Sequence, residues 1–233
     1  MPIGIIVNCL AVAIGGLIGS SASDLLSDQI KQNLNMIFGL ASMGMGVSSI
    51  VLMQNMPAVI LALVTGTLLG LSLGLGDAIT RAAAGMQKLF HAEGGRSDQL
   101  VTVIVLFCAS GTGIYGSIVS GMSGDHSILI AKSILDFFTA MIFACSLKKT
   151  VSLIAVPQFI IMMILFVLAG YIMPLTTPAM INDFKACGGF VMIASGFRIL
   201  QLKMFPTADM IPAMILVMPL SFLWASYILP LLA

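Results

Sequence analysis

Apolar runs of about twenty residues, separated by short polar connectors, follow one another along almost the whole chain. A run of that length crosses the hydrocarbon core of a bilayer as a helix. The runs lack the regular polar and apolar alternation that membrane-barrel strands require. The pattern therefore predicts an all-α, polytopic membrane protein. We expect eight spans, at Ile3–Ser20, Met36–Met53, Pro57–Gly76, Gln99–Ser120, Ile128–Leu147, Val151–Leu175, Phe184–Gln201 and Ala208–Leu229.

The longest polar stretch, Asp77–Asp98, has a helical pattern of its own. Its apolar residues recur at helical spacing, whereas Arg81 and Lys88 lie on another face. This pattern predicts a helix that lies in the headgroup region on the cytoplasmic side. The shorter stretch around Leu26–Ile37 has a similar pattern, and either an interfacial helix or a solvated connector explains it.

The first three and last three predicted spans resemble each other. Gly39 and Gly46 in the second span correspond to Gly189 and Gly196 in the seventh, 150 positions later. A Pro-Ala-x-Ile-Leu motif recurs 155 positions later, at Pro57 and Pro212 (the first ends Ile60-Leu61, the second Ile215-Leu216). An odd number of crossings separates the two sets, so they run in opposite directions.

This pattern predicts a 3+2+3 inverted repeat, an arrangement found in transporters and some channels. The whole chain, residues 1–233, then forms a single membrane domain with four parts. These are repeat unit one (1–76), the interfacial segment (77–98), a central helix pair (99–147) and repeat unit two (151–233).

Composition agrees with lipid as the main solvent of this chain. Of its 233 residues, 59% are hydrophobic and only 8% are charged, against roughly 25% charged in a soluble domain. The net charge of +1 gives no indication of a nucleic-acid partner. The four cysteines are dispersed among apolar runs, so we expect neither a metal nor a cofactor.

Lysine and arginine indicate the orientation. If the N-terminus is outside, only Lys185 falls on the outer side, and Lys132 lies within a span. The others fall on the opposite side: Lys31, Arg81, Lys88, Arg96, Lys148, Lys149, Arg198 and Lys203. Because the side rich in basic residues is the cytoplasm, we expect both termini to be extracytoplasmic.

Polar residues inside the spans concentrate in the central helix pair. Lys132 and Asp136 are four residues apart, so they share a helix face and can pair. An ion at the centre of a span costs about 2.5–3.5 kcal/mol, so these two should face protein or water. The run Ser110-Gly111-Thr112-Gly113 joins poor helix formers and predicts a local break that exposes backbone groups.

Depth estimates bring several of these residues to one level of the membrane. At 1.5 Å per residue, Asp136 and Thr112 lie about 12 Å from the outer surface, and Ser110 about 15 Å. Lys132 and Asn8 lie at about 6–8 Å. We therefore predict one substrate- or ion-binding site that contains Asp136, Lys132, Ser110, Thr112, Gly111, Gly113 and Asn8.

Structural roles compete with these functional interpretations. Lys132 and Asp136 can serve as a pair that joins two spans, and Asn8 can bond a neighbouring helix. Asp125 and His126 are expected to close an outer loop. No zinc-protease, nucleophile-elbow or phosphate-loop motif occurs, so we do not expect an enzyme.

Several stretches resemble the YqgA-type family of bacterial inner-membrane proteins, which also includes YdfK-like proteins. They are Ile6-Val7-Asn8 with Gly15-Gly16, the block Phe107–Ile114, and Gly124-Asp125 followed by Ser127–Phe143. The resemblance covers the whole chain, although His126 is not part of it. It implies a bacterial inner-membrane protein from a domain-of-unknown-function family, described only as membrane or transport proteins, and it implies no substrate.

These observations favour a secondary transporter of a small polar solute or ion, with a site near the midplane. A channel of the same architecture is the main alternative, and a non-transporting scaffold or regulatory subunit is another. The scaffold alternative predicts that the polar residues are fully paired. A homodimer formed through a glycine-rich face is a further option.

Overall fold

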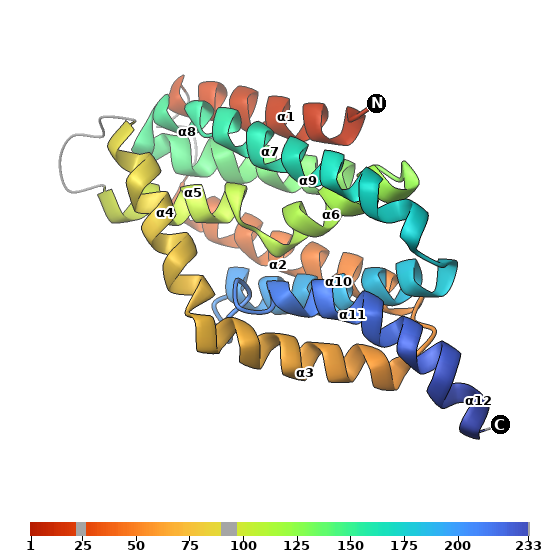
Figure 1. Cartoon of the computed structure of the whole chain (residues 1–233). Coiled ribbons are helices and arrows are strands. Elements are labelled where there is room, and N and C mark those ends of the chain that lie inside the picture. Colours follow the sequence, from red (N-terminus) through yellow and green to blue (C-terminus); the bar gives the residue numbers. More distant parts are fainter. Residues whose placement is uncertain (22–26, 90–96, 233) are drawn as a thin grey trace. The chain divides into compact units, whose positions relative to one another are not determined.

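The computed structural model describes residues 1–21, 27–89 and 97–232, and in these ranges the chain forms helices joined by turns and short irregular segments (Figure 1). The all-α prediction is therefore confirmed. The first helices are α1 (Ile3–Ser21), α2 (Asp28–Ile50), α3 (Met56–Leu73), α4 (Leu75–Leu89), α5 (Ser97–Cys108) and α6 (Gly111–Ser123). They are followed by α7 (Ser127–Leu147), α8 (Thr150–Leu153), α9 (Ala155–Ile172), a 3₁₀ turn (Met173–Leu175) and α10 (Pro178–Ile199). The chain closes with α11 (Ile211–Leu223), a π-helical turn (Trp224–Ile228) and α12 (Leu229–Leu232).

Within the described ranges, six helical segments are long and apolar enough to cross a membrane. They are Ile3–Ser21, Met56–Leu73, Val103–Ser123, Ser127–Leu147, Thr150–Leu175 and Ile211–Leu231. These match six of the eight predicted spans, so the count of eight is not confirmed. The other two fall on α2 and α10, which are long enough but carry polar residues within their first two turns. Lys31 in α2 and Asp183 in α10 are among these residues.

Two predicted interfacial segments take a definite form. Helix α4 covers the first part of the 77–98 segment, while residues 90–96 lie outside the described ranges. Its Ala83 is buried and Met86 packs on a hydrophobic core, whereas Arg81 is exposed. Helix α2 runs without interruption from Asp28, so within the described residues the 26–37 pattern does not form a separate helix.

The chain packs into two compact units. Unit 1 comprises residues 1–38 and 77–171, and unit 2 comprises residues 39–76 and 172–233. Each unit thus takes helices from both predicted repeats. Unit 1 contains α1 and α9, and unit 2 contains α3, α10 and α11.

In unit 1, α1 packs very closely along α7 because glycines face the neighbouring backbone. A side-chain carbon added to Gly15 would overlap the carbonyl oxygen of Phe137, and one on Gly19 would overlap that of Met141. Small residues let membrane helices approach in this way, and the approach brings the polar residues of the two helices within hydrogen-bonding distance.

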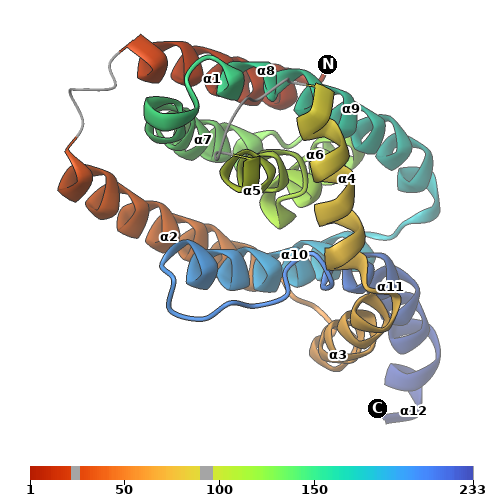
Figure 2. The ribbon, with the colours of Figure 1, turned by 90° about the vertical axis from the view of Figure 1, so that its left-hand side faces the viewer.

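In unit 2, α10 and the second half of α2 cross in opposite directions (Figure 2), and their glycine contacts are reciprocal. A Cβ on Gly46 would lie 2.6 Å from the carbonyl oxygen of Gly189, and one on Gly189 would lie 2.6 Å from that of Gly46. Gly39 and Gly196 approach each other in the same manner. Near the centre, the Ser42 hydroxyl donates to the carbonyl of Met192 over 3.0 Å.

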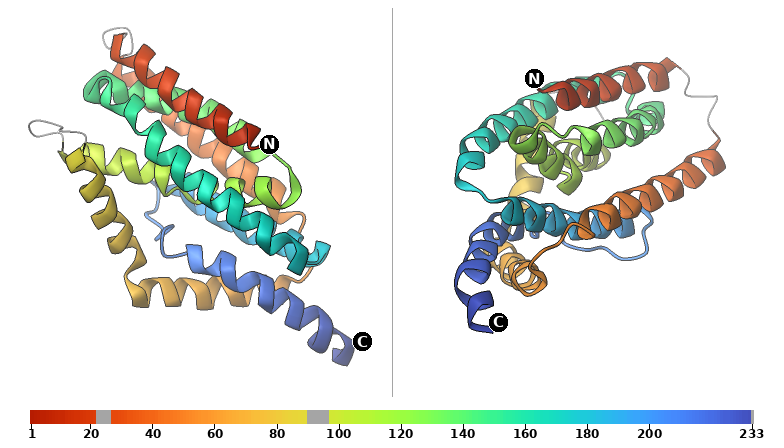
Figure 3. Two further views of the ribbon diagram at one scale, coloured as in Figure 1. Left: turned by 45° about the horizontal axis from the view of Figure 1, so that its top comes forward. Right: turned by 90° about the vertical axis from the view of Figure 1, so that its right-hand side faces the viewer.

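Helices α3 and α11 lie side by side in the same unit (Figure 3). A Cβ on Gly66 would overlap the backbone of Ala213, so the lack of a side chain at Gly66 permits the close approach of these two helices.

A buried carboxylate completes unit 2. Asp183 of α10 accepts hydrogen bonds from the backbone N–H groups of Gln54 (2.7 Å) and Asn55 (2.9 Å), just before α3 begins. Its other oxygen accepts from the Asn55 amide (2.9 Å) and the Ser221 hydroxyl (2.6 Å). Neutral donors thus satisfy the charge, and the two residues that precede α3 are hydrogen-bonded to another helix.

Candidate functional site

The candidate site lies in unit 1, where the fourth predicted span is broken. Helix α5 ends at Cys108 and α6 begins at Gly111 (Figure 1), which confirms the predicted break. Ser110 is extended, with φ −69° and ψ 136°, and its hydroxyl oxygen accepts from the N–H of Gly113 over 3.1 Å. Serine favours this capping position, and the glycines that follow resist helix continuation.

The first turn of α6 presents buried hydrogen-bond donors. Gly111 and Thr112 are both buried. Within the described ranges, their backbone N–H groups have no acceptor, and the Thr112 hydroxyl has no partner. Helix N-termini leave such groups free, but they normally meet a cap or water. The break therefore offers donors at the positive end of a helix dipole.

Lys132 and Asp136 form the ion pair that their spacing predicts. The Lys132 Nζ donates to Oδ2 of Asp136. The two residues are only 4% and 6% exposed. Because the pair is enclosed by protein, neither residue faces lipid.

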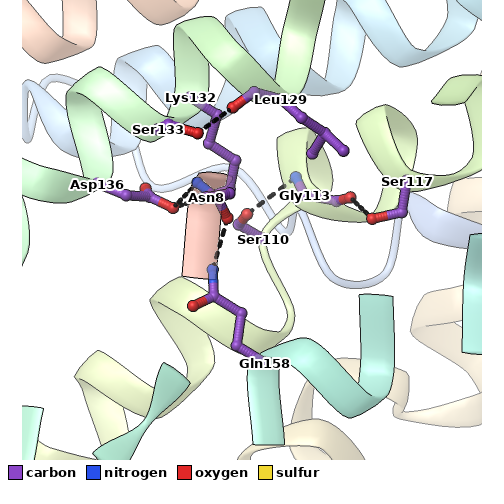
Figure 4. Close-up of polar contacts among 9 residues, drawn as sticks. All are labelled: Asn8, Ser110, Gly113, Ser117, Leu129, Lys132, Ser133, Asp136 and Gln158. Carbon is purple, nitrogen blue, oxygen red and sulfur yellow. Dashed lines mark hydrogen bonds and ion pairs between the residues drawn. The ribbon is translucent and has the colours of Figure 1, made fainter. Parts of the chain in front are cut away.

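Two amides extend this pair across three helices (Figure 4). The Asn8 Nδ2 group of α1 donates to the same Asp136 oxygen over 2.9 Å, and Gln158 of α9 donates from Nε2 to the Asn8 Oδ1 over 2.8 Å. Asn8 and Gln158 are both fully buried. The network therefore joins α1, α7 and α9 through side chains alone.

The order of donors and acceptors fixes the orientation of both amides. An ionised carboxylate only accepts, so Asn8 must turn its NH₂ group toward Asp136. Its oxygen then faces Gln158, which must also present NH₂. As a result, the Gln158 Oε1 atom is buried without a partner among the described residues. Oδ1 of Asp136 likewise accepts no hydrogen bond from the part of the chain that the structure describes.

Lys132 connects the network to the helix break. A Cβ on Gly113 would lie 3.2 Å from Cε of Lys132 and 2.9 Å from Cε of Met162, so the lysine stem rests on the first turn of α6. Its Nζ lies 6.0 Å from the centre of the Phe107 ring. The ammonium makes one hydrogen bond within the described ranges and keeps two N–H groups unused.

The structure thus brings together Asn8, Lys132, Asp136 and the break at residues 110–113. Gln158 was absent from the predicted site. It is a single polar residue in an apolar run, and one such residue does not by itself predict a binding site. The signal that identifies it is the repeat, because Gln158 stands 150 positions after Asn8, the same offset as the paired glycines.

Asp125 and His126 lie in the turn between α6 and α7 and do not join the network. Asp125 accepts from the N–H and hydroxyl of Ser127, over 3.0 and 2.6 Å. His126 Nδ1 is 2.6 Å from the Ser120 hydroxyl. Gly124 ends α6 with φ +70°, a left-handed conformation that suits glycine. These contacts close the turn.

Comparisons with known proteins find relatives that match nearly the whole chain. The profile of a family described as "Protein of unknown function (DUF554)" matches residues 3–222. The chain is 47% identical to the uncharacterized protein YqgA of Escherichia coli (strain K12), over 97% of this chain and 99% of that protein. It is 25% identical to the uncharacterized membrane protein YdfK of Bacillus subtilis (strain 168), over 91% and 93%. No solved structure matches.

Proposed function

This chain belongs to the DUF554 family of membrane proteins, and because that family's function is unknown, we propose a function from the chain's own geometry. It is a secondary transporter of a small polar solute or ion. The observation that carries this proposal is a buried network beside a broken helix, in which polar groups have no partner among the described residues. Transporter sites are commonly built at such breaks.

The unpaired groups favour binding over a purely structural role. A buried acceptor without a donor costs about 1–3 kcal/mol, so a structural network gains by satisfying it. Within the described residues, Gln158 Oε1 carries that cost. A scaffold would be expected to pair it. A solute that supplies donors would remove the cost when it binds.

Reciprocal contacts support the inverted repeat that alternating access uses. Asn8 bonds Gln158 and Ser42 bonds Met192, each 150 positions away. Under the same offset, the contact of Gly39 with Gly196 maps onto that of Gly189 with Gly46. A two-fold relation between the two sets of helices produces such exchanges. The enclosure of the charged residues also suits a carrier better than an open, water-lined pore.

Flux measurements test the transporter proposal. We expect proteoliposomes that contain the purified chain to exchange at least one solute from a panel of Na⁺, K⁺, chloride, acetate, methylamine and glycine. Exchange should saturate and show counterflow, and protein-free liposomes should show neither. Steady conductance in a planar bilayer without counterflow would instead indicate a channel. No flux by either method, with no solute bound, would leave the scaffold alternative.

We also propose a location in the bacterial inner membrane, with eight crossings and both termini extracytoplasmic. The distribution of lysine and arginine supports this orientation. Helices α2 and α10 must then cross, although their composition is polar for a span. Their glycine-lined contact places protein rather than lipid against part of each helix.

Cysteine labelling in the full chain distinguishes eight crossings from six. Gln54 and Lys149 are both exposed in loops. With eight crossings and an outer N-terminus, a membrane-impermeant maleimide added to intact cells should label Gln54→Cys and not Lys149→Cys. If α2 and α10 do not cross, the pattern reverses. The unsubstituted chain gives the background from its own cysteines.

A further inference from the structure

The unpaired polar groups around the helix break are of two opposite kinds. Donors gather at the first turn of α6, where the N–H groups of Gly111 and Thr112 are free within the described residues, and on the ammonium of Lys132. Acceptors are Gln158 Oε1 and Asp136 Oδ1. A ligand that satisfies both sets must accept hydrogen bonds from the first and donate hydrogen bonds to the second.

Figure 4 shows how these groups are disposed around Asn8. Lys132 and Gln158 extend toward it from different helices, and the Ser110–Gly113 turn lies beside them. Lys132 rests on that turn, so one positive side chain and one helix N-terminus are neighbours. Such a pair attracts an anionic group. The fully buried oxygen of Gln158 provides independent evidence that a donor is missing from the site.

Net charge narrows the choice of ligand. The ion pair of Lys132 and Asp136 is neutral, and both residues are nearly enclosed. A lone cation or a lone anion would leave one uncompensated charge in a medium of low dielectric, which is costly. A zwitterion adds equal charges of both signs and leaves the balance at zero. Its two ends also match the two sets of unpaired groups.

We propose that the site binds a small zwitterionic solute of the amino-acid class. The N–H groups of α6 and Lys132 hold its carboxylate, and Asp136 Oδ1 and Gln158 Oε1 hold its ammonium group. The solute must be small, since even a methyl group on Gly113 would press on Lys132 and Met162. Glycine is therefore the first probe. This inference rests on the proposed function and names its substrate class.

The experiment compares glycine with its two halves. Acetate lacks the ammonium group, and methylamine lacks the carboxylate. We expect radiolabelled glycine to show saturable counterflow in proteoliposomes and to raise the melting temperature of the detergent-purified chain. Unlabelled glycine should compete at least tenfold more effectively than acetate or methylamine at the same ionic strength.

A matched pair of variants locates the site. Gln158→Leu removes the buried acceptor, and we expect glycine affinity to fall at least tenfold. Ser133→Ala is the control, because the Ser133 hydroxyl donates to the carbonyl of Leu129 within its own helix, one residue from Lys132. The glycine affinity of this control should stay within twofold of that of the unsubstituted chain. Size-exclusion profiles verify folding, and the competition series with the unsubstituted chain does not depend on either variant.

The possible results separate this inference from the proposed function. If acetate competes as well as glycine, the site binds anions, and if methylamine does, it binds cations. Either result would contradict the proposal of a zwitterionic ligand, while the proposed transport function would stand. An unchanged affinity in Gln158→Leu moves the site elsewhere and also overturns the inference. If no panel solute exchanges or raises the melting temperature, the proposed function fails as well.

Discussion

Replacing Asp136 with asparagine should abolish solute exchange and lower the free energy of unfolding by about 3–5 kcal/mol. The pair is buried, and Lys132 has no other carboxylate partner among the described residues. The substitution therefore leaves an uncompensated ammonium inside the protein. Asn8 keeps a bond, because the new amide oxygen can still accept from it. Flux in proteoliposomes and denaturation in detergent measure the two effects.

A second variant separates the structural role of the charges from their functional role. In Lys132→Met with Asp136→Asn, both charges are removed and the Asn8 hydrogen bond can remain. Replacing a buried ion pair with neutral groups is often neutral for stability, so the double variant should recover most of the loss. Exchange should stay absent. If exchange returned with stability, the pair would be a structural contact, and the proposed site would be wrong.

Gly46→Leu should destabilise the protein by about 3 kcal/mol, at the upper end of the range for overpacking. A Cβ there meets the carbonyl oxygen of Gly189, which is backbone and cannot rotate away. Gly44→Leu provides a matched control on the same helix, since a Cβ on Gly44 has nothing within 4 Å. Its effect should stay within about 0.5 kcal/mol. Thermal unfolding, followed by size exclusion, measures both.

The reciprocal contact extends this test. Because Gly189 meets the carbonyl of Gly46 at the same distance, Gly189→Leu should cost about as much as Gly46→Leu. Equal losses in Gly44→Leu and Gly46→Leu would show that any bulk on α2 is harmful and that the crossing is not the cause.

Much of the helical architecture follows from the sequence because apolar length and local propensity act within one segment. The break at Ser110 is an example, since a good cap followed by glycines opposes helix continuation wherever it occurs. The Lys132–Asp136 pair is another, because residues four apart meet on any helix. Neither required knowledge of the neighbouring helices.

Features that depend on which helices meet could not be predicted in this way. Gln158 joins the network only because the fold brings it beside Asn8, which is 150 positions away in the sequence. Helix α2 runs unbroken for 23 residues although its first turn is polar. Composition alone does not predict which parts of such a helix contact protein instead of lipid. The division into two units also follows from packing. Each unit contains helices of both predicted repeats, because helices that are distant in the sequence can pack together.

The hydrogen bonds that Asp183 accepts just before α3 have a consequence for how this chain is made. Asp183 bonds the N–H groups of Gln54 and Asn55 from 129 and 128 positions further along the chain. While the ribosome is still synthesising the middle of the protein, that carboxylate does not yet exist. Until it is made, the two N–H groups have only water as a partner, so the early hairpin of α2 and α3 lacks this contact. Unit 2 can close only after α10 has emerged, which makes its assembly a late event of translation.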